Sequence, residues 1–216
     1  MNIIIHRGTH QIGGSAIEIS TASTRIVLDF GNELSLDEKY TPINLDINGV
    51  TKGIADCDGI VISHYHMDHL GQLTSALPEI PLYMGELSKE IAIISAEYQD
   101  KDLYLRLLGA NTFRGGEAFT IRNIHIRPLV IDHSAADSYM FVIEAEGKRV
   151  LYTGDFRMHG LRHHILEKLV NTYIGEVDVL ITEGTSLSRD EDECISEAAV
   201  LEDISSYIQD GKYVFV

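Results

Sequence analysis

Three histidines and one aspartate lie close together in the segment ISHYHMDHL, residues 62–70. Zinc and other divalent ions accept imidazole nitrogen and carboxylate oxygen, and a catalytic ion keeps a position open for water. His64 and His66 are two residues apart, so on an extended segment they point to the same side and can bind one ion. Asp68 and His69 follow around a turn and can face a second ion. The alternative is a solvated, histidine-rich turn; four ligand-type residues in so short a segment favour a metal site.

Two later segments place further ligand-type residues after apolar runs. VIDHSAADSY presents Asp132 and His133, and RVLYTGDF ends near Gly154 and Asp155. Taken singly, a histidine after a strand is more often a hydrogen-bonded loop residue, and a Gly-Asp pair is usually a turn. Because the main cluster also follows an apolar strand, the three segments can meet at one edge. A carboxylate between two cations can bind both, so Asp155 is the candidate for a bridging ligand.

The first half of the chain reads as short strands followed by helices. The pattern predicts an antiparallel meander, an apolar strand covered on both faces, a short helix, another strand and a long helix. The expected ranges are 2–5, 16–19 and 25–30 for the meander, then 59–63, 70–76, 81–84 and 86–108. The long helix is expected to carry one apolar stripe, formed by Leu87, Ile91, Ile94 and Tyr98.

The second half continues the alternation. The expected elements are a strand at 119–131 with a break at Pro128, a hairpin of 139–144 and 149–153 around Glu146-Gly147-Lys148, a helix at 161–170, a buried strand at 177–182, a helix at 195–208 and a strand at 212–216. Helices between groups of strands predict a layered α/β protein. The last strand is apolar and has nothing after it to cover it, so it could pair with a second copy of the chain.

Composition limits the function classes. The 216 residues suffice for one domain with a substantial core. The net charge of -16, from 33 acidic and 17 basic residues, argues against a broad basic face for a polyanion. Two cysteines, Cys57 and Cys194, are too few for a disulfide scaffold and fit a reducing compartment. No segment approaches the ~20 apolar residues of a membrane span. We therefore expect a soluble cytoplasmic protein.

The motifs together resemble those of a known superfamily. Residues 64–69, then His133, then Thr153-Gly-Asp155, resemble the second, third and fourth motifs of the metallo-β-lactamase superfamily, and Asp29 in IVLDFGNE resembles its first. The match runs in the right order over nearly the whole chain. It implies an αββα sandwich with two divalent ions at one edge, zinc being expected and Mn²⁺ or iron being the alternatives.

The resemblance also implies a role for each residue. Asp29 would support the ligand loop without binding an ion. The implied ligands are His64, His66 and His133 on one ion, Asp68 and His69 on the other, and Asp155 between the two.

Two segments resemble one branch of the superfamily. GTHQIGGSAIEI and ITEGTSLSRD are similar to the β-CASP nucleases, RNA-processing enzymes that include ribonuclease J. Glu183 fits the strand end where that branch opens a large insertion; alternatively, it ends a core strand and 185–190 caps the next helix. The resemblance implies a metallo-β-lactamase domain over 1–190 and the start of the insertion over 191–216. The branch supplies a last zinc-binding histidine later, and none follows Glu183, so we expect the N-terminal piece of a longer protein, incomplete at its C-terminus.

The expected function is an RNA-cleaving phosphodiesterase. Two ions would lower the pKa of water so that hydroxide forms near neutral pH and attacks phosphorus. Asp68 or His133 would orient that water, and Glu183 is a third catalytic candidate. RNA is the expected partner of the longer protein, and because the second ion is one ligand short, the sequence leaves open whether this shortened chain is active or inactive. Two alternatives stay open: a small-molecule hydrolase of the thioesterase or lactonase type, and a non-catalytic subunit. A small-molecule hydrolase should have a further histidine ligand late in the same sheet, and this sequence lacks it. A non-catalytic subunit should have lost metal ligands, and here they are present.

Overall fold

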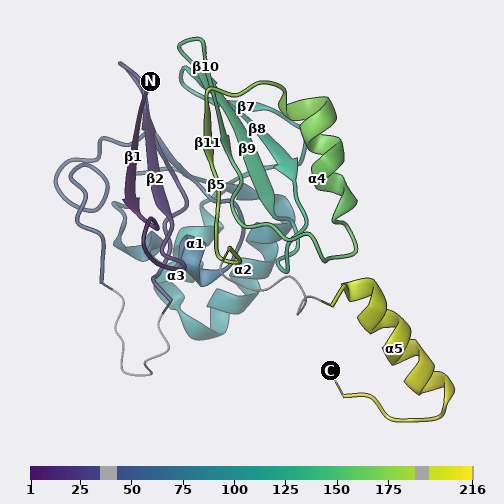
Figure 1. Cartoon of the computed structure of the whole chain (residues 1–216). Coiled ribbons are helices and arrows are strands. Elements are labelled where there is room, and N and C mark those ends of the chain that lie inside the picture. Colours follow the sequence, from purple (N-terminus) through teal and green to yellow (C-terminus); the bar gives the residue numbers. More distant parts are fainter. Residues whose placement is uncertain (35–42, 188–194, 216) are drawn as a thin grey trace.

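The computed structural model describes residues 1–34, 43–187 and 195–215 (Figure 1). Its strands are β1 (Asn2–Arg7), β2 (Ala16–Ser20), β3 (Arg25–Leu28), β4 (Gly59–Val61), β5 (Leu82–Gly85), β6 (Asn111–Phe113), β7 (Phe119–Ile121), β8 (Ile124–Val130), β9 (Tyr139–Ala145), β10 (Lys148–Tyr152) and β11 (Val179–Ile181). Its helices are α1 (Met67–Leu70), α2 (Glu86–Gln99), α3 (Lys101–Leu108), α4 (His164–Leu169) and α5 (Glu197–Gln209), with a 3-10 helix η1 (Leu73–Ser75) and a π-helix η2 (Val170–Ile174).

Two sheets pack face to face with helices on their outer faces (Figure 1). The first sheet has the strand order β1-β2-β3-β4-β5-β6, and the second has the order β11-β10-β9-β8-β7. Helices α1 to α3 cover the outer face of the first sheet, and α4 covers that of the second. The predicted αββα sandwich is therefore confirmed.

Alternation along the central strands builds this layered core. In β9, Phe141 and Ile143 point between the sheets, whereas Met140 and Val142 pack under α4. Successive side chains of a strand point to opposite faces, so a strand that is apolar at every position must be covered on both sides. The strand β4 is likewise buried throughout, between β3 and β5, as its sequence predicted.

Several other expected elements are confirmed. Strands β1, β2 and β3 pair antiparallel in a meander. Strands β9 and β10 form the predicted hairpin, with Glu146 and Gly147 at φ values of 51° and 69°. This left-handed pair is typical of the two-residue turns that match the twist of a hairpin.

The prediction of one long helix over 86–108 is wrong, because the helix is interrupted at Asp100. The Asp100 backbone is extended, and its side chain accepts hydrogen bonds from the backbone N–H groups of Asp102 and Leu103, which starts α3. The predicted apolar stripe does not face the sheet: Ile94 and Tyr98 are exposed. The buried residues of α2 are the small Ser88, Ala92 and Ala96, which let the helix approach the sheet closely.

The single strand predicted over 119–131 is two strands, β7 and β8, joined at Arg122, whose φ is 49°. The break expected at Pro128 is also wrong. Pro128 lies inside β8 opposite Phe141, and its carbonyl accepts from the N–H of Gly116 on the other side. Its nitrogen therefore points away from β9, so the proline removes no hydrogen bond from that ladder.

Three expectations near the C-terminus fail. The strand predicted as buried over 177–182 is β11, an edge strand in which Val179 and Leu180 are exposed. The strand predicted over 212–216 is absent from 212–215, where Tyr213 and Phe215 are almost fully exposed, so the pairing of copies through it loses its basis. The helix predicted over 161–170 begins later, at His164, and continues as η2. Cys194, Val216 and the boundary drawn at residue 190 lie outside the described residues.

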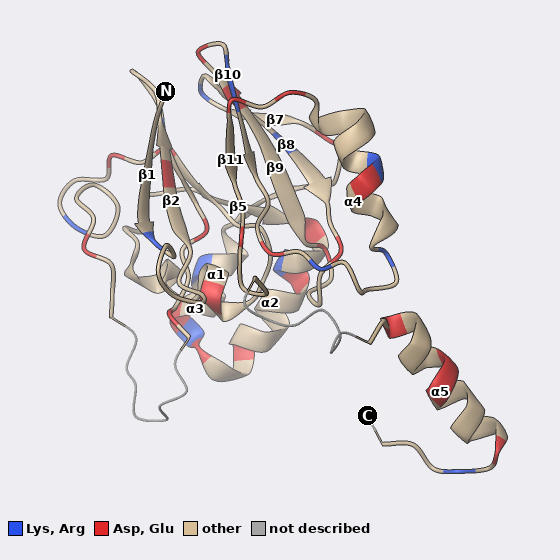
Figure 2. Ribbon diagram, in the orientation of Figure 1, with Lys and Arg blue, Asp and Glu red and all other residues tan. Residues whose placement is uncertain are grey.

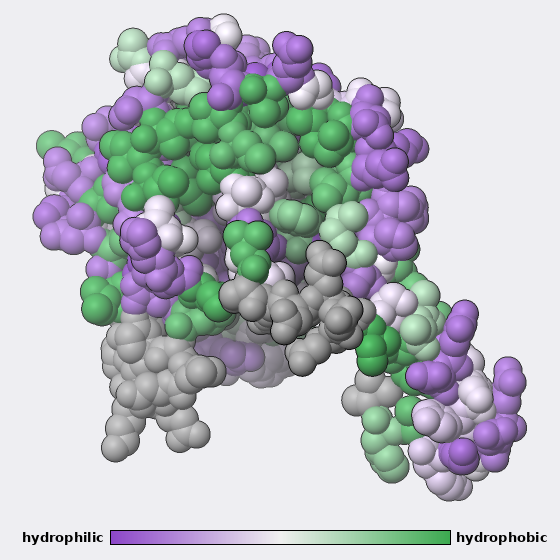
Figure 3. Space-filling model, viewed as in Figure 1, coloured by the Kyte–Doolittle hydropathy of each residue, from purple (hydrophilic) through white to green (hydrophobic). Residues whose placement is uncertain are grey.

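The edge strands β1 and β11 lie on the same side of the molecule (Figure 1). Both carry exposed apolar side chains, and apolar surface extends over this side above a central hollow (Figure 3). Among the described residues, no helix is long and apolar enough to cross a membrane.

Candidate metal centre

Three strands carry the ligand-type residues to one edge of the sandwich. β4 leads into the loop with His64 and His66, β8 leads to His133, and β10 leads to Asp155. β8 and β10 both pair antiparallel with β9, so they run in the same direction and end at the same edge. The segment after His66 is helical, which corrects the predicted helix start at residue 70.

The early start of α1 changes how two of the candidates are held. Asp68 and His69 lie in the four-residue helix Met67–Leu70, whereas the sequence predicted a turn there. The side chain of His69 is buried, and that of Asp68 is only partly exposed.

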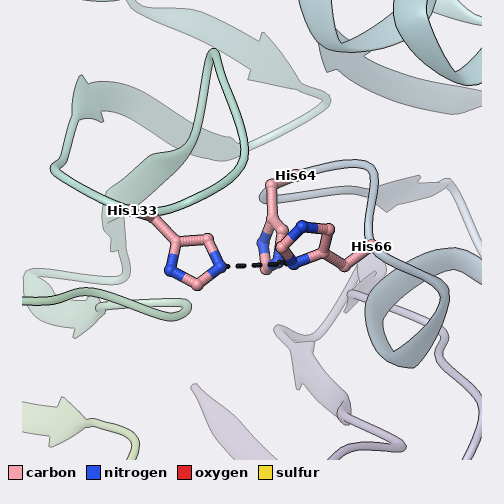
Figure 4. A group of neighbouring side chains, drawn as sticks. All are labelled: His64, His66 and His133. Atoms are coloured by element: carbon pink, nitrogen blue, oxygen red, sulfur yellow. Dashed lines mark hydrogen bonds between the residues drawn. The ribbon is translucent and has the colours of Figure 1, made fainter. Parts of the chain in front are cut away.

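Three imidazole nitrogens converge at this edge (Figure 4). His64 Nε2 lies 3.1 Å from His66 Nδ1, and His133 Nε2 lies 3.3 Å from the same atom. Zinc–nitrogen bonds of 2.0–2.1 Å in a tetrahedral site place ligand nitrogens about 3.3 Å apart. The spacings of His66 Nδ1 from the His64 and His133 nitrogens therefore fit one tetrahedral ion.

A second group shares His64 and adds His69 and Asp155, with one ligand atom from each lying within 4.8 Å of the others. His69 Nε2 is 3.2 Å from Asp155 Oδ1, while Asp155 Oδ2 is 4.0 Å from His133 Nε2. The two oxygens of Asp155 thus face the two groups, as expected of a bridging ligand. Asp68 Oδ2 lies 3.7 Å from His69 Nε2, beside the second group.

Asp29 organises the residues behind these ligands. It has no exposed surface, and its φ of 54° is unusual for a residue other than glycine. Its carboxylate accepts hydrogen bonds from the Ser63 N–H (2.7 Å), the Ser63 hydroxyl (2.8 Å), His69 Nδ1 (2.7 Å) and the Tyr152 hydroxyl (2.5 Å). This network holds His69 with Nε2 towards Asp155. Sequence reasoning anticipated a supporting role for Asp29 but missed Ser63 and Tyr152, for which no local pattern gave a signal.

The same network fixes which nitrogen of His64 carries a proton. The Ser63 hydroxyl donates to Asp29, so its oxygen accepts from His64 Nδ1–H at 3.0 Å. That leaves the lone pair of His64 Nε2 directed at the candidate ion. Outer hydrogen bonds of this kind orient metal-binding imidazoles in proteins generally.

Burial and nearby charges divide the histidines into two kinds. Burial, reinforced by the neighbouring imidazoles, holds the pKa of His64 well below its usual range. Burial also lowers the pKa of His66, and it lowers that of His133 to about 4. Burial opposes the charge on His69 as well, but Asp29 and Asp155 outweigh it and raise its pKa well above the usual value. At neutral pH the trio therefore offers uncharged nitrogens, the form that binds a cation.

Glycine permits the close approach of the ligand helix to β3. A Cβ on Gly31 would lie 1.6 Å from the backbone oxygen of Asp68 and 2.5 Å from the nitrogen of His69. The backbone N–H of Phe30 also donates to the His69 carbonyl at 2.7 Å. The residues just after β3 therefore set the position of α1.

Two sequence candidates hold the loops of the candidate ligands. Asp132 is buried and turned to Arg157 (3.3 Å) and to the backbone N–H of Arg162 (3.0 Å), so it supports the His133 loop. Glu183 accepts from the backbone N–H of Phe156 at 2.8 Å and thereby holds the loop that follows Asp155. Glu183 also lines a groove of about 620 Å³ together with Asp68, His69 and Asp155.

The donor set, the fold and the order of the motifs together agree with a family comparison. A model described as the β-lactamase superfamily domain matches residues 24–206. The chain belongs to this superfamily. The metallo-β-lactamase resemblance predicted from the sequence is thus confirmed.

Relatives of the chain include proteins named as ribonucleases. The chain is 27% identical to an RNase J-like protein of Methanocaldococcus jannaschii, over 98% of this chain and 49% of that protein. It is 27% identical to ribonuclease J of Helicobacter pylori, over 70% of this chain and 22% of that protein. It is also 27% identical to cleavage and polyadenylation specificity factor 73 of Drosophila melanogaster, over 81% and 27% of the two chains. The chain thus spans about half, or less, of the length of these relatives.

Two solved structures share the fold. A protein of unknown function from Enterococcus faecalis V583 superimposes with a TM-score of 0.78 at 21% identity, covering 96% of this chain and 57% of that one. The metallo-β-lactamase fold protein YhfI from Bacillus subtilis gives a TM-score of 0.51 at 16% identity, covering 82% and 69%.

Proposed function

We propose that this chain carries the catalytic centre of a metal-dependent RNA phosphodiesterase of the β-CASP branch. The observation that carries the proposal is the convergence of histidine nitrogens and the Asp155 carboxylate, from both sheets, at spacings that fit two neighbouring divalent ions. The ribonuclease names of two of these relatives favour RNA as the substrate class.

The chain's own residues have separate tasks in this proposal. Bound Zn²⁺, or Mn²⁺ or iron, would lower the pKa of a water molecule and stabilise negative charge on the phosphate. His64, His66 and His133 would hold one ion, His69 and Asp68 the other, and Asp155 would lie between them. Asp29 would keep His69 aligned through Nδ1.

Proton handling falls to the residues at the groove. The Asp68 carboxylate, which is partly exposed in the groove, would orient the attacking water and accept its proton. His133 is the second candidate for orienting that water. Glu183 would act indirectly, because its hydrogen bond holds the loop that carries Asp155.

We also propose that residues 1–190 form the metallo-β-lactamase domain and that 191–216 begin the insertion. Helix α5 has no buried residue and extends away from the sandwich (Figure 1). Near its start, Glu197 binds Arg157 at 2.7 Å and the backbone N–H of Leu161 at 3.0 Å. This arrangement is what the first helix of a separate unit would show.

A cleavage assay on end-labelled single-stranded RNA tests the function. The protein is stripped with a chelator, reloaded with Zn²⁺ or Mn²⁺, and compared with Asp155→Asn and with His125→Gln, a surface histidine remote from the site. We expect metal-dependent cleavage that falls at least about 10²-fold in Asp155→Asn and is unchanged in His125→Gln. No cleavage with any ion tested, or cleavage that survives Asp155→Asn, would contradict the proposal.

Parallel assays with a thioester and a lactone as substrates distinguish the two substrate classes. Turnover of either by the metal-loaded protein, without RNA cleavage, would establish the small-molecule hydrolase instead. Metal stoichiometry, measured by mass spectrometry of the native protein, should be two ions per chain, and one in Asp155→Asn or His69→Gln.

A further inference from the structure

Several cations near helix α4 have no acidic partner in the part of the chain that the structure describes, which is unusual in this acidic protein. Among the described residues, no ion pair involves Arg127, Arg162 or Lys168. Most other cations are paired, as Lys148 is with Asp178 at 2.7 Å. Figure 2 shows positive residues on the loop before α4 and on α4 itself. Unpaired, exposed cations in a protein of net charge -16 are available for an anionic partner.

Two of these cations stand beside an apolar cleft. A cleft of about 500 Å³ opens between β8 and α4, and its lining includes Arg127, Leu129, Val130, Lys168, Leu169 and Tyr173. Leu129 and Leu169 form its buried floor, and Tyr173 is 48% exposed at its side. The cleft therefore combines two positive charges with an accessible aromatic ring and an apolar surface.

The cleft lies close to the candidate metal centre. Val130 ends β8 and precedes His133 by three residues, which corresponds to about 10 Å of extended chain. Arg162 precedes α4 in the sequence. Its backbone N–H donates a hydrogen bond to Asp132, the neighbour of His133. The edge of the cleft at Val130 therefore lies within about 10 Å of the candidate ligand His133.

We propose that this cleft binds single-stranded RNA beside the catalytic centre, with a base against Tyr173 and phosphates at Arg127 and Lys168. The inference rests on the proposed function for the choice of polymer. Proteins that bind single strands combine cations that follow the backbone with aromatic side chains on which bases stack. A peptide made only of acidic residues would pair with the cations but would leave the exposed tyrosine ring and the apolar floor without a partner.

The test measures binding, not cleavage, so that it stands apart from the catalytic proposal. A fluorescent, single-stranded oligoribonucleotide is titrated by anisotropy with the metal-free 216-residue chain in EDTA, at several salt concentrations. Arg127→Gln/Lys168→Gln is compared with Lys52→Gln/Lys101→Gln, which removes the same charge from exposed positions elsewhere. The loss of two phosphate contacts should reduce the slope of log affinity against log salt concentration by about 1.4. It should also weaken binding about 25-fold at 0.1 M salt. The control pair should bind like the wild type.

The aromatic contact is tested at Tyr173. Tyr173→Ala should weaken binding at least about fivefold, whereas Tyr173→Phe, which keeps the ring, should bind like the wild type. Circular dichroism and urea unfolding establish that each variant folds.

Each outcome decides one question. Equal affinity and salt dependence in the two double variants, or equal affinity in the two Tyr173 variants, would overturn the inference even if the protein cleaves RNA. Absence of RNA binding by the wild type would overturn it as well. The predicted binding pattern without any cleavage would support the cleft and refute the catalytic proposal alone.

Discussion

Replacing Asp29 by asparagine changes the chemistry of a side chain that has no exposed surface. Four donors, two of them from Ser63 and one each from His69 and Tyr152, point at its two oxygens. In either orientation the asparagine NH₂ group meets at least one of these donors, so at least two buried hydrogen-bonding groups lose their partners.

The magnitude follows from those contacts. Each unsatisfied buried group costs about 1–3 kcal/mol, and removing one partner of a buried ion pair costs about 3–5 kcal/mol. We therefore expect Asp29→Asn to destabilise the folded chain by about 4 kcal/mol. Tyr152→Phe removes one of the four donors and leaves the carboxylate otherwise satisfied, so it should cost about 1.5–3 kcal/mol.

Urea denaturation in EDTA measures both variants without a contribution from metal. Calorimetric titration with Zn²⁺ should also show an affinity about 10–100-fold lower for Asp29→Asn, because outer hydrogen bonds orient ligand imidazoles. If Asp29→Asn unfolds at the same urea concentration as Tyr152→Phe, the account of Asp29 as the organising residue is wrong.

Three further predictions concern other positions. Gly31→Ala should destabilise the chain by about 3 kcal/mol or more and reduce zinc uptake, because its Cβ would overlap the Asp68 carbonyl; unchanged unfolding and metal content would contradict this. Burial raises the pKa of Glu18, but hydrogen bonds from Arg25 and His6 outweigh it and the net pKa is lowered, so the stability that Glu18 adds is present above pH ~4.3 and is lost as the pH falls further. The difference in unfolding free energy between wild type and Glu18→Gln should accordingly shrink from pH 6 to pH 3, and a difference that grows would refute it. Burial raises the pKa of Cys57 to about 11, so peptide mapping should find it unalkylated at pH 8 until urea is added.

Local patterns in the sequence predicted much of the fold and the composition of the site. His64 and His66 were recognisable because their spacing alone places two imidazoles on one side of an extended segment. His133 and Asp155 could be added because both follow apolar strands, and the structure brings them to the same edge.

The errors have physical causes. The outward face of α2 carries Ile94 and Tyr98, whereas the inward face carries Ala92 and Ala96, because small side chains allow the helix to lie close to the sheet. A reading based on large apolar residues therefore chose the wrong face. The hydrogen bond from Tyr152 to Asp29 joins residues 123 positions apart, and no local pattern indicates which buried hydroxyl meets which buried acid.

The two groups of ligand-type residues draw on both halves of the sandwich. The segment 64–69 follows strand β4 of the first sheet, whereas His133 and Asp155 follow strands β8 and β10 of the second. Ions held there would cross-link the two sheets. Free metal at 100 times its dissociation constant would raise the free energy of unfolding by about 2.7 kcal/mol. Reciprocally, Phe141→Ala would remove packing between the two sheets. It should therefore lower the affinity for the ions, although Phe141 does not contact them.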